Sequence, residues 1–148
     1  MAKLLPDDFR DSLKLCNQNR VKYLLIGGYA VGYYGYPRAT ADMDVWIERS
    51  EENAAKVVAV LKWFGFDRPE LSPELFLQSG KVIRMGRPPL RLELLNEISG
   101  VTFAKSYPRR RRVKLAGIRV DVISLEHLKA NKAAAGRPKD LDDLEHLP

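Results

Sequence analysis

Two aspartates with the spacing of same-face strand residues are the side chains of this sequence best suited to chemistry. Asp42 and Asp44 are separated by Met43, and because strand side chains alternate between the two faces of a sheet, both carboxylates point the same way. Adjacent carboxylates repel each other, and a cation between them removes that repulsion. Oxygen ligands on a rigid strand are those that Mg²⁺ prefers. The pair therefore predicts a divalent metal site.

A glycine pair precedes the aspartates, with 13 residues between Gly28 and Asp42. Gly27 and Gly28 follow the apolar run Leu24–Ile26, where a strand is expected to turn into a helix. Glycine lets a phosphate approach the backbone closely, and the start of a helix offers free N–H groups. A phosphate site beside a metal site serves phosphoryl or nucleotidyl transfer, in which catalysis is mostly positioning and charge neutralisation.

The residues around the aspartates predict the element that positions them. Apolar residues alternate with the two carboxylates over Asp42–Glu48, so this segment is expected to be a strand with one core face. Arg38 and Thr40 share the parity of the aspartates if the strand starts early. Polar residues continuing on one face, opposite an apolar face, favour a functional site over a merely solvated strand.

Helix caps, apolar periodicity and turn residues divide the rest of the chain into further elements. Helices are expected over Leu5–Asn19, Tyr29–Tyr34, Ser50–Phe64, Ser124–Ala135 and Lys139–Leu147, and strands over Val21–Ile26, Asp42–Glu48, Lys81–Met85, Leu90–Leu95, Val113–Leu115 and Ile118–Ile123. Residues 68–78 are expected to be irregular or briefly helical, and Asn96–Pro108 to be a loop. This order predicts a single α/β or α+β domain over residues 1–148.

Composition fits one globular domain and excludes several classes of protein. Of the 148 residues, 45% are hydrophobic, which is enough for a core, yet no apolar run approaches the roughly 20 residues of a membrane span. Acidic residues interrupt the N-terminal segment, so no signal peptide is expected, and the single Cys16 excludes an intrachain disulfide. A cytoplasmic protein is the simplest interpretation.

The net charge of +6 is moderate but unevenly distributed along the chain. The run Arg109, Arg110, Arg111 and Arg112 is unbroken, and lysines flank it on both sides. A solvated hairpin edge is the favoured interpretation, because charged side chains keep edge strands from pairing with other chains. Contact with a nucleic acid or an acidic partner is the alternative.

Two longer stretches resemble a known family. The first is GGYAV at residues 27–31 with RATADMDV at residues 38–45, and the second runs from VISLE at residues 122–126 to NKAAAGRPKDLDDL at residues 131–144. Together they make the chain similar to the small bacterial stand-alone members of the DNA polymerase beta-like nucleotidyltransferase superfamily. The resemblance implies a mixed β-sheet flanked by helices, two Mg²⁺ ions, an NTP donor and a third carboxylate on a later strand.

The resemblance also implies roles for three carboxylates. Asp42 and Asp44 would bind both metal ions, and Glu93 would complete the second metal site, at a position where such members usually carry Asp. Strand parity alone leaves Asp121 as a rival for this third position. Glu93 is preferred because its strand precedes a loop and a hairpin, as the third-carboxylate strand does in the family.

The remaining site predictions concern the nucleotide. Gly27 and Gly28 would hold the β and γ phosphates, and Arg38 and Thr40 are counted among the nucleotide-binding residues. The resemblance suggests a triphosphate contact for Lys132. Its place near the end of a helix has a simpler alternative explanation, since the helix dipole favours a cation there.

Three functions remain open on the sequence. The leading one is an enzyme that moves an NMP group from an NTP to a hydroxyl of RNA or protein and releases pyrophosphate. The second is a catalytically weak, antitoxin-like or adaptor module on the same fold that binds a partner protein or RNA, because small members of the family often occur in toxin–antitoxin pairs. The third is an RNA-binding protein whose affinity depends on the arginine run and whose metal site is incidental.

Overall fold

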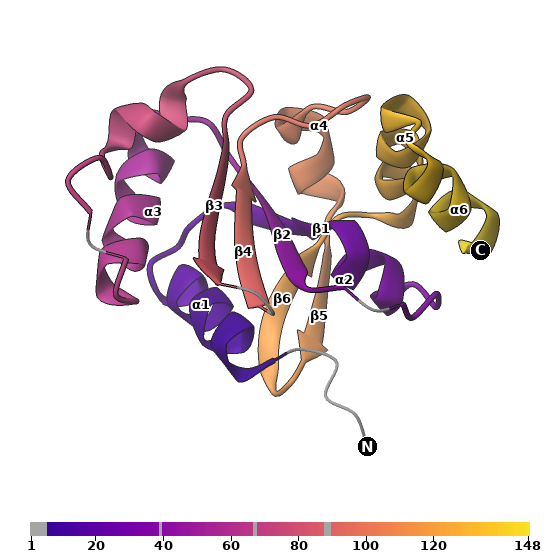
Figure 1. Cartoon of the computed structure of the whole chain (residues 1–148), viewed down its shortest axis with the longest axis horizontal. Helices are drawn as coiled ribbons and strands as arrows, with labels where there is room; N and C mark the ends of the chain where they lie inside the picture. The colour runs from indigo at the N-terminus through magenta and orange to yellow at the C-terminus, as the bar shows by residue number, and fades with distance from the viewer. Residues whose placement is uncertain (1–5, 39, 67, 88–89) are drawn as a thin grey trace.

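The structure is a computed structural model that describes residues 6–38, 40–66, 68–87 and 90–148. A six-stranded sheet runs through its centre in the order β3-β4-β2-β1-β6-β5 (Figure 1). The strands are β1 (Tyr23–Ile26), β2 (Asp42–Ile47), β3 (Val82–Arg87), β4 (Leu90–Leu95), β5 (Arg111–Leu115) and β6 (Ile118–Val122). The β1–β6 and β2–β4 pairs are parallel and the other three are antiparallel, so the prediction of a mixed sheet is confirmed.

Helices cover the sheet and its ends. They are α1 (Asp7–Gln18), α2 (Gly27–Tyr33), α3 (Glu51–Trp63), α4 (Phe103–Ser106), α5 (Leu125–Ala135) and α6 (Pro138–His146), with 3₁₀ turns η1 (Pro73–Leu77) and η2 (Tyr107–Arg109). In Figure 1, α1 and α3 lie toward one side of the molecule and α5 and α6 toward the other. The chain is thus one small α+β domain, as the alternating elements predict. In the described part of the chain, no helix has the length and apolar character to cross a membrane.

The central strand β2 has two chemically different faces. Met43, Val45 and Ile47 are at most 1% exposed, and residues of α1, α3 and β4 lie around Val45 and Ile47. Asp42 and Asp44 occupy the opposite face and are only partly buried. The alternation of apolar and acidic residues in the sequence therefore corresponds to one face of β2 in the core and one face at the site.

Trp46 shares the face of the aspartates and is 1% exposed. The ring of Phe103 in α4 meets it edge to face, with centroids 5.2 Å apart. This contact explains an error in the sequence interpretation, because α4 lies inside Asn96–Pro108, which the sequence predicts to be a loop, and η2 begins there. A short helical turn forms there because it buries Phe103 against a residue some 60 positions away, which local sequence does not reveal.

Several element boundaries also differ from expectation. The helix after β1 begins at Gly27 rather than Tyr29, and β5 begins at Arg111 rather than Val113, because Arg111 and Arg112 pair with β6. The strand of the aspartates starts at Asp42, so Arg38 precedes it in a loop. The expected helix start at Leu5 lies outside the described residues. Ser50 and Ser124, where two helices are expected to begin, are their N-caps, since each accepts a hydrogen bond from the backbone three residues later.

Candidate active site

An open cleft of about 1360 Å³ lies on the face of the sheet that carries the aspartates. All eight residues that the sequence assigns to the site line it: Gly27, Gly28, Arg38, Thr40, Asp42, Asp44, Glu93 and Lys132. Residues 95–105 and further residues of α5 also line it. The structure therefore brings together residues that span more than 100 positions of the chain.

Strand register places Glu93 beside the aspartates. In the parallel pair of β2 and β4, Asp44 is the partner of Glu93, and in the antiparallel pair of β1 and β2 it is the partner of Ile26. Paired residues on neighbouring strands share a face and lie about 5 Å apart. Asp121, the rival for the third carboxylate, is not among the residues that line the cleft. The role of Glu93 as the third carboxylate remains a prediction, but its position fits that role.

The glycine pair is required by the close approach of two neighbouring segments. Gly27 has φ +68°, a left-handed conformation that other residues rarely adopt, and a Cβ at this position would overlap the carboxylate of Asp44. A Cβ on Gly28 would come within 3.0 Å of the Thr40 side chain. Thr40 is itself held by a 3.1 Å hydrogen bond that its hydroxyl donates to the backbone carbonyl of Asp42. The backbone at the glycines therefore lies directly against the acidic centre of the cleft.

Asp44 carries the most perturbed carboxyl group of the cleft. Burial, and then the charge of Glu93 and a hydrogen bond with it, raise the pKa of Asp44 to about 7 from an ordinary value of 3.8. Asp42 raises this pKa further, and Lys139 lowers it. Three carboxylates with too little compensating positive charge attract a cation, and their oxygens suit a hard divalent ion.

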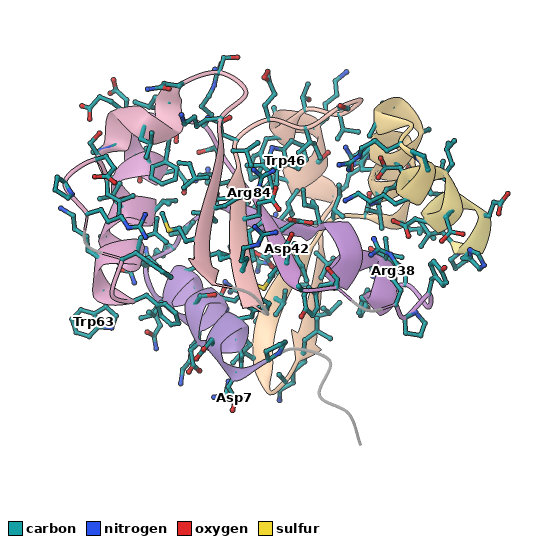
Figure 2. All side chains as sticks on the ribbon, in the orientation of Figure 1. Asp7, Arg38, Asp42, Trp46, Trp63 and Arg84 are labelled. Atoms are coloured by element: carbon teal, nitrogen blue, oxygen red, sulfur yellow. The ribbon has the colours of Figure 1, made fainter. Side chains whose placement is uncertain are left out.

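Two arginines on neighbouring strands hold the other carboxylates in this structure. Nε of Arg91 donates to Oδ1 of Asp42 at 3.1 Å, and Nε of Arg84 lies 3.5 Å from Oε1 of Glu93. Figure 2 shows Asp42 and Arg84 over the middle of the sheet, near Trp46. Within residues 6–38, 40–66, 68–87 and 90–148, no three acidic, histidine or cysteine side chains already form a metal-binding cluster. The carboxylate oxygens suit a hard metal ion, but Asp42 would have to release Arg91 and Glu93 would have to release Arg84 to bind one.

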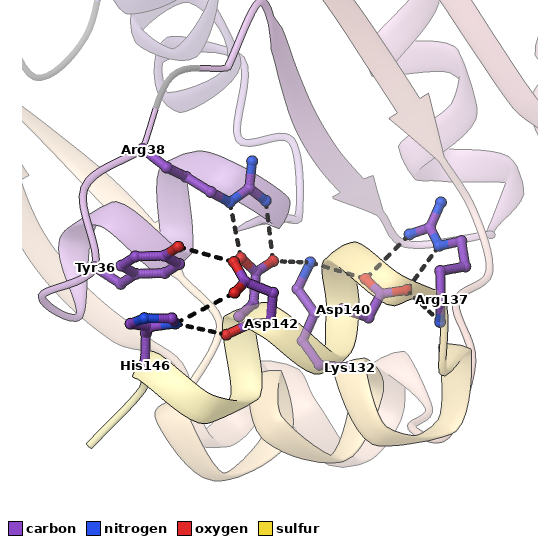
Figure 3. Close-up of polar contacts among 8 residues, drawn as sticks. Tyr36, Arg38, Lys132, Arg137, Asp140, Asp142 and His146 are labelled. Carbon is purple, nitrogen blue, oxygen red and sulfur yellow. Dashed lines mark hydrogen bonds and ion pairs between the residues drawn. The ribbon is translucent and has the colours of Figure 1, made fainter.

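A layer of ion pairs joins the cleft to α6 (Figure 3). Lys132 is 4% exposed, and its Nζ lies 3.1 Å from Asp140 and 2.9 Å from Asp143. Arg38 donates two hydrogen bonds to the carboxylate of Asp143, at 2.8 and 2.9 Å. Arg137 binds Asp140 at 2.7 Å. Lys132 and Arg38 thus line the cleft from within a shared network.

Asp143 is the residue that the sequence interpretation missed. Burial alone would raise its pKa, but hydrogen bonds from Arg38 and Lys132 hold the pKa below the ordinary value. The signal was present, because Asp140 and Asp143 are three residues apart on one face of a helix. Its partner Arg38 lies 105 positions away, and that distance is why the pairing could not be read from the sequence.

Comparison with known proteins agrees with this geometry at the level of the fold. No family model and no curated protein matches the chain. Among solved structures, the chain is similar to a putative nucleotidyltransferase from Thermotoga maritima (TM-score 0.58, 18% identity, covering 92% of this chain and 87% of that one). It is also similar to ANT(2")-Ia in complex with adenylyl-2"-tobramycin (TM-score 0.56, 14% identity, 92% and 83%).

A third similar structure is an antigenic nucleotidyltransferase-like protein from Paracoccidioides brasiliensis, with a TM-score of 0.55 and 20% identity over 97% of this chain and 77% of that one. The three neighbours are too distant in sequence to carry over any residue's role. They agree with one another on the fold. The chain has the nucleotidyltransferase fold, as the resemblance in its sequence implies.

The raised pKa of Asp44 predicts a pH-dependent gain in stability on mutation. Because the folded protein keeps a proton that the unfolded chain releases near pH 3.8, the free energy of unfolding falls as pH rises toward 8. Asp44→Asn removes this pH-dependent loss of stability. The variant should therefore be more stable than wild type at pH 8, by about 1 kcal/mol or more. The difference should shrink at pH 5. Urea unfolding at both pH values measures it.

The matched control for this comparison is Glu70→Gln, which removes an exposed carboxylate outside the cleft. It should leave the stability difference between the two pH values unchanged. An Asp44→Asn variant that differs from wild type by the same free energy at pH 5 and pH 8 would show that Asp44 is not the strained carboxyl group.

Proposed function

We propose that this chain is a Mg²⁺-dependent nucleotidyltransferase that moves an NMP group from an NTP to an acceptor hydroxyl. The observation that carries the proposal is the position of Asp44, which lies against the Gly27 backbone and across from Glu93 in one cleft. A hard cation bound by these carboxylates would lie directly beside the glycine backbone at the start of α2, where phosphates could approach N–H groups. The fold supports a general nucleotidyl transfer activity.

The roles of the acidic residues follow from the chemistry. The acceptor oxygen bonds to the α-phosphorus as the bond to the β-phosphate bridge breaks, so pyrophosphate leaves and the hydroxyl proton must be taken up. Asp42 and Asp44 would hold two Mg²⁺ ions, which neutralise charge on the triphosphate and the leaving group. Glu93 would complete the second metal site and receive the proton of the acceptor hydroxyl.

The nucleotide would lie along the glycine pair. Gly27 and Gly28 would hold the β and γ phosphates through their backbone N–H groups at the start of α2. The Thr40 side chain, which packs against Gly28, would border them. Arg38 and Lys132 supply positive charge at the same end of the cleft, where Asp143 orients both cations. The ion pairs keep these long side chains in place before a ligand arrives, which lowers the entropic cost of binding.

The size of the cleft supports a second substrate beside the nucleotide. Small-molecule sites usually occupy about 300–1,000 Å³. The cleft here is about 1360 Å³, and residues 95–105 line it beside the predicted nucleotide-binding residues. We therefore propose that an acceptor hydroxyl, from RNA or protein, binds along residues 95–105. The adenylyl-2"-tobramycin held by one structural neighbour is an example of a nucleotidyl group joined to an acceptor on this fold.

One observation favours the alternative of a catalytically weak, antitoxin-like or adaptor module. Arg91 forms an ion pair with Asp42, and Arg84 forms one with Glu93. A metal ion would have to displace both arginines. Both arginines are substantially exposed, with 40% and 62% of the side chain accessible, and such pairs contribute little stability. A protein that binds Mg-NTP and shows no turnover with any acceptor would support this alternative.

The first prediction of the proposal concerns the aspartate pair. Asp42→Asn combined with Asp44→Asn should reduce Mg²⁺-dependent NTP affinity at least tenfold, because the ions lose their ligands while the fold remains. Titration calorimetry with each NTP measures the affinity. Glu70→Gln combined with Glu74→Gln is the charge-matched control and should bind as wild type does. Equal Mg-NTP affinity of the aspartate variant and wild type would rule out this metal site.

The second prediction separates the two candidates for the third carboxylate. Glu93→Gln should reduce transfer by orders of magnitude and change Mg-NTP affinity little, because its role lies in the chemical step. Asp121→Asn should reduce transfer less, when rates are expressed per folded molecule. Circular dichroism supplies that correction, since Asp121 is 2% exposed and its loss affects stability. If Asp121→Asn proves the more damaging change, the third carboxylate has been placed on the wrong strand.

A further inference from the structure

The whole excess charge of this protein lies in one segment. Residues 105–122 contain seven lysines and arginines against one aspartate, a net charge of +6 that equals the charge of the entire chain. We call six of these cations the basic ridge: Arg109, Arg110, Arg111, Arg112, Lys114 and Arg119. The other 130 residues are electrically neutral as a set. So strong a segregation of charge creates a local positive field that a neutral partner would not need.

The basic ridge occupies η2 and the β5–β6 hairpin, at one edge of the sheet. Its cations are mostly exposed, with accessible side-chain fractions of 69% for Arg109, 55% for Arg112 and 50% for Arg119. A strand at a sheet edge needs some charge to prevent pairing with other chains. Edge protection alone would be served by separate, solvated side chains.

Three of the six cations instead converge on one buried carboxylate, while Arg109 lies 3.8 Å from Glu126. Nε atoms of Arg110 and Arg112 lie 3.6 Å from the carboxylate oxygens of Asp121, and Nε of Arg119 lies 4.0 Å away. Asp121 is 2% exposed. One carboxylate offsets one guanidinium, so the cluster keeps two unbalanced positive charges in fixed positions. Repulsion among three guanidiniums is unfavourable unless another anion joins them.

Aromatic rings hold the inner part of the basic ridge. The guanidinium of Arg110 lies 3.9 Å from the centroid of Tyr107, which stacks on Phe103 with centroids 5.2 Å apart. Phe103 in turn packs against Trp46, which lines the cleft. Within the described residues, Nε of Arg110 and Oδ1 of Asp121 are buried without a hydrogen-bond partner. The cluster is therefore fixed in place, while its hydrogen-bonding capacity is not exhausted.

Register places Arg112, Lys114 and Arg119 of the basic ridge on the face of the sheet that carries the aspartates, and Arg111 on the opposite face. Arg111 pairs with Val122, Val122 with Leu25, and Leu25 with Val45, which follows Asp44. Three strand spacings therefore separate the ridge from the aspartates, about 14 Å. Arg112, the partner of Asp121, falls on the same face of the sheet as Asp44 by this register. Lys105 lines the cleft itself and leads from it toward the ridge.

We propose that the basic ridge binds the phosphodiester backbone of a nucleic-acid acceptor and directs its hydroxyl toward Asp44 and Glu93. Guanidinium groups suit phosphates because they donate paired hydrogen bonds. The delivery of the hydroxyl rests on the proposed nucleotidyl transfer. The binding of nucleic acid to the basic ridge does not depend on it, so the two claims can fail separately.

A matched pair of variants tests the proposal. The ridge variant is Arg111→Gln, Arg112→Gln and Lys114→Gln, which leaves Arg110 and Arg119 on Asp121. The control is Lys14→Gln, Lys62→Gln and Arg68→Gln, three exposed cations outside the cleft and the ridge. Each variant has lost three positive charges, so any difference between them reflects position. Fluorescence anisotropy then measures binding of a short single-stranded RNA, a DNA of the same sequence and poly-glutamate across a salt series.

The ridge variant should bind RNA at least tenfold more weakly than the control at moderate salt. Its slope of log K against log[salt] should be less steep by about 2, since each lost phosphate contact removes roughly 0.7 for a single strand. Tighter binding of RNA than of DNA identifies RNA as the acceptor class, and equal binding identifies the shared backbone. Mg-ATP affinity should stay at the wild-type value in both variants.

Three results would overturn the proposal. Equal loss of RNA affinity in both variants would show that net charge acts without a site. Poly-glutamate bound as tightly as RNA would identify an acidic protein partner instead. A wild-type protein that binds Mg-ATP and no nucleic acid would remove the acceptor assignment and leave the proposed nucleotidyl transfer standing. A wild-type protein that does not bind Mg-ATP would contradict the proposed function, without bearing on the binding of nucleic acid to the basic ridge.

Discussion

The crowding of negative charge around Asp44 is the constraint on which the rest of this structure depends. Its carboxylate lies on the central strand, next to Glu93 and directly against the backbone of Gly27. No residue with a side chain fits at Gly27 without moving that carboxylate, so the turn from β1 into α2 and the register of β2 are set together. A protein selected for stability alone would not place carboxylates in this way, because each raises the cost of ionising the next.

Positive charge is arranged around this acidic centre in layers. Arg84 and Arg91 lie on the adjacent strands, and Arg38 and Lys132 lie on the side of α6, where buried aspartates hold them. Buried ion pairs contribute little net stability, since desolvation offsets much of their attraction. Their value here is geometric. The network fixes two long cationic side chains in the wall of the cleft and makes the docking of α6 part of the site.

The sequence contained enough information for the strands and the acidic pair, and too little for the contacts between distant segments. Alternation of apolar residues with Asp42 and Asp44 predicted β2 and both of its faces, because a period of two is a local property. The burial of Lys132 could not be read, because it depends on how α5 meets α6. The pairing of Arg91 with Asp42 and the short helix α4 were missed for the same reason.

The measurement that tests the central claim most directly follows the two ends of the triphosphate. The purified protein is incubated with Mg²⁺, total RNA or cell lysate, and each NTP labelled either at the α or at the γ phosphorus. Nucleotidyl transfer retains the α phosphorus in the acceptor and releases the γ phosphorus as pyrophosphate. We expect Mg²⁺-dependent incorporation of the α label and none of the γ label. Incorporation of the γ label, or of neither label despite bound nucleotide, would contradict the account.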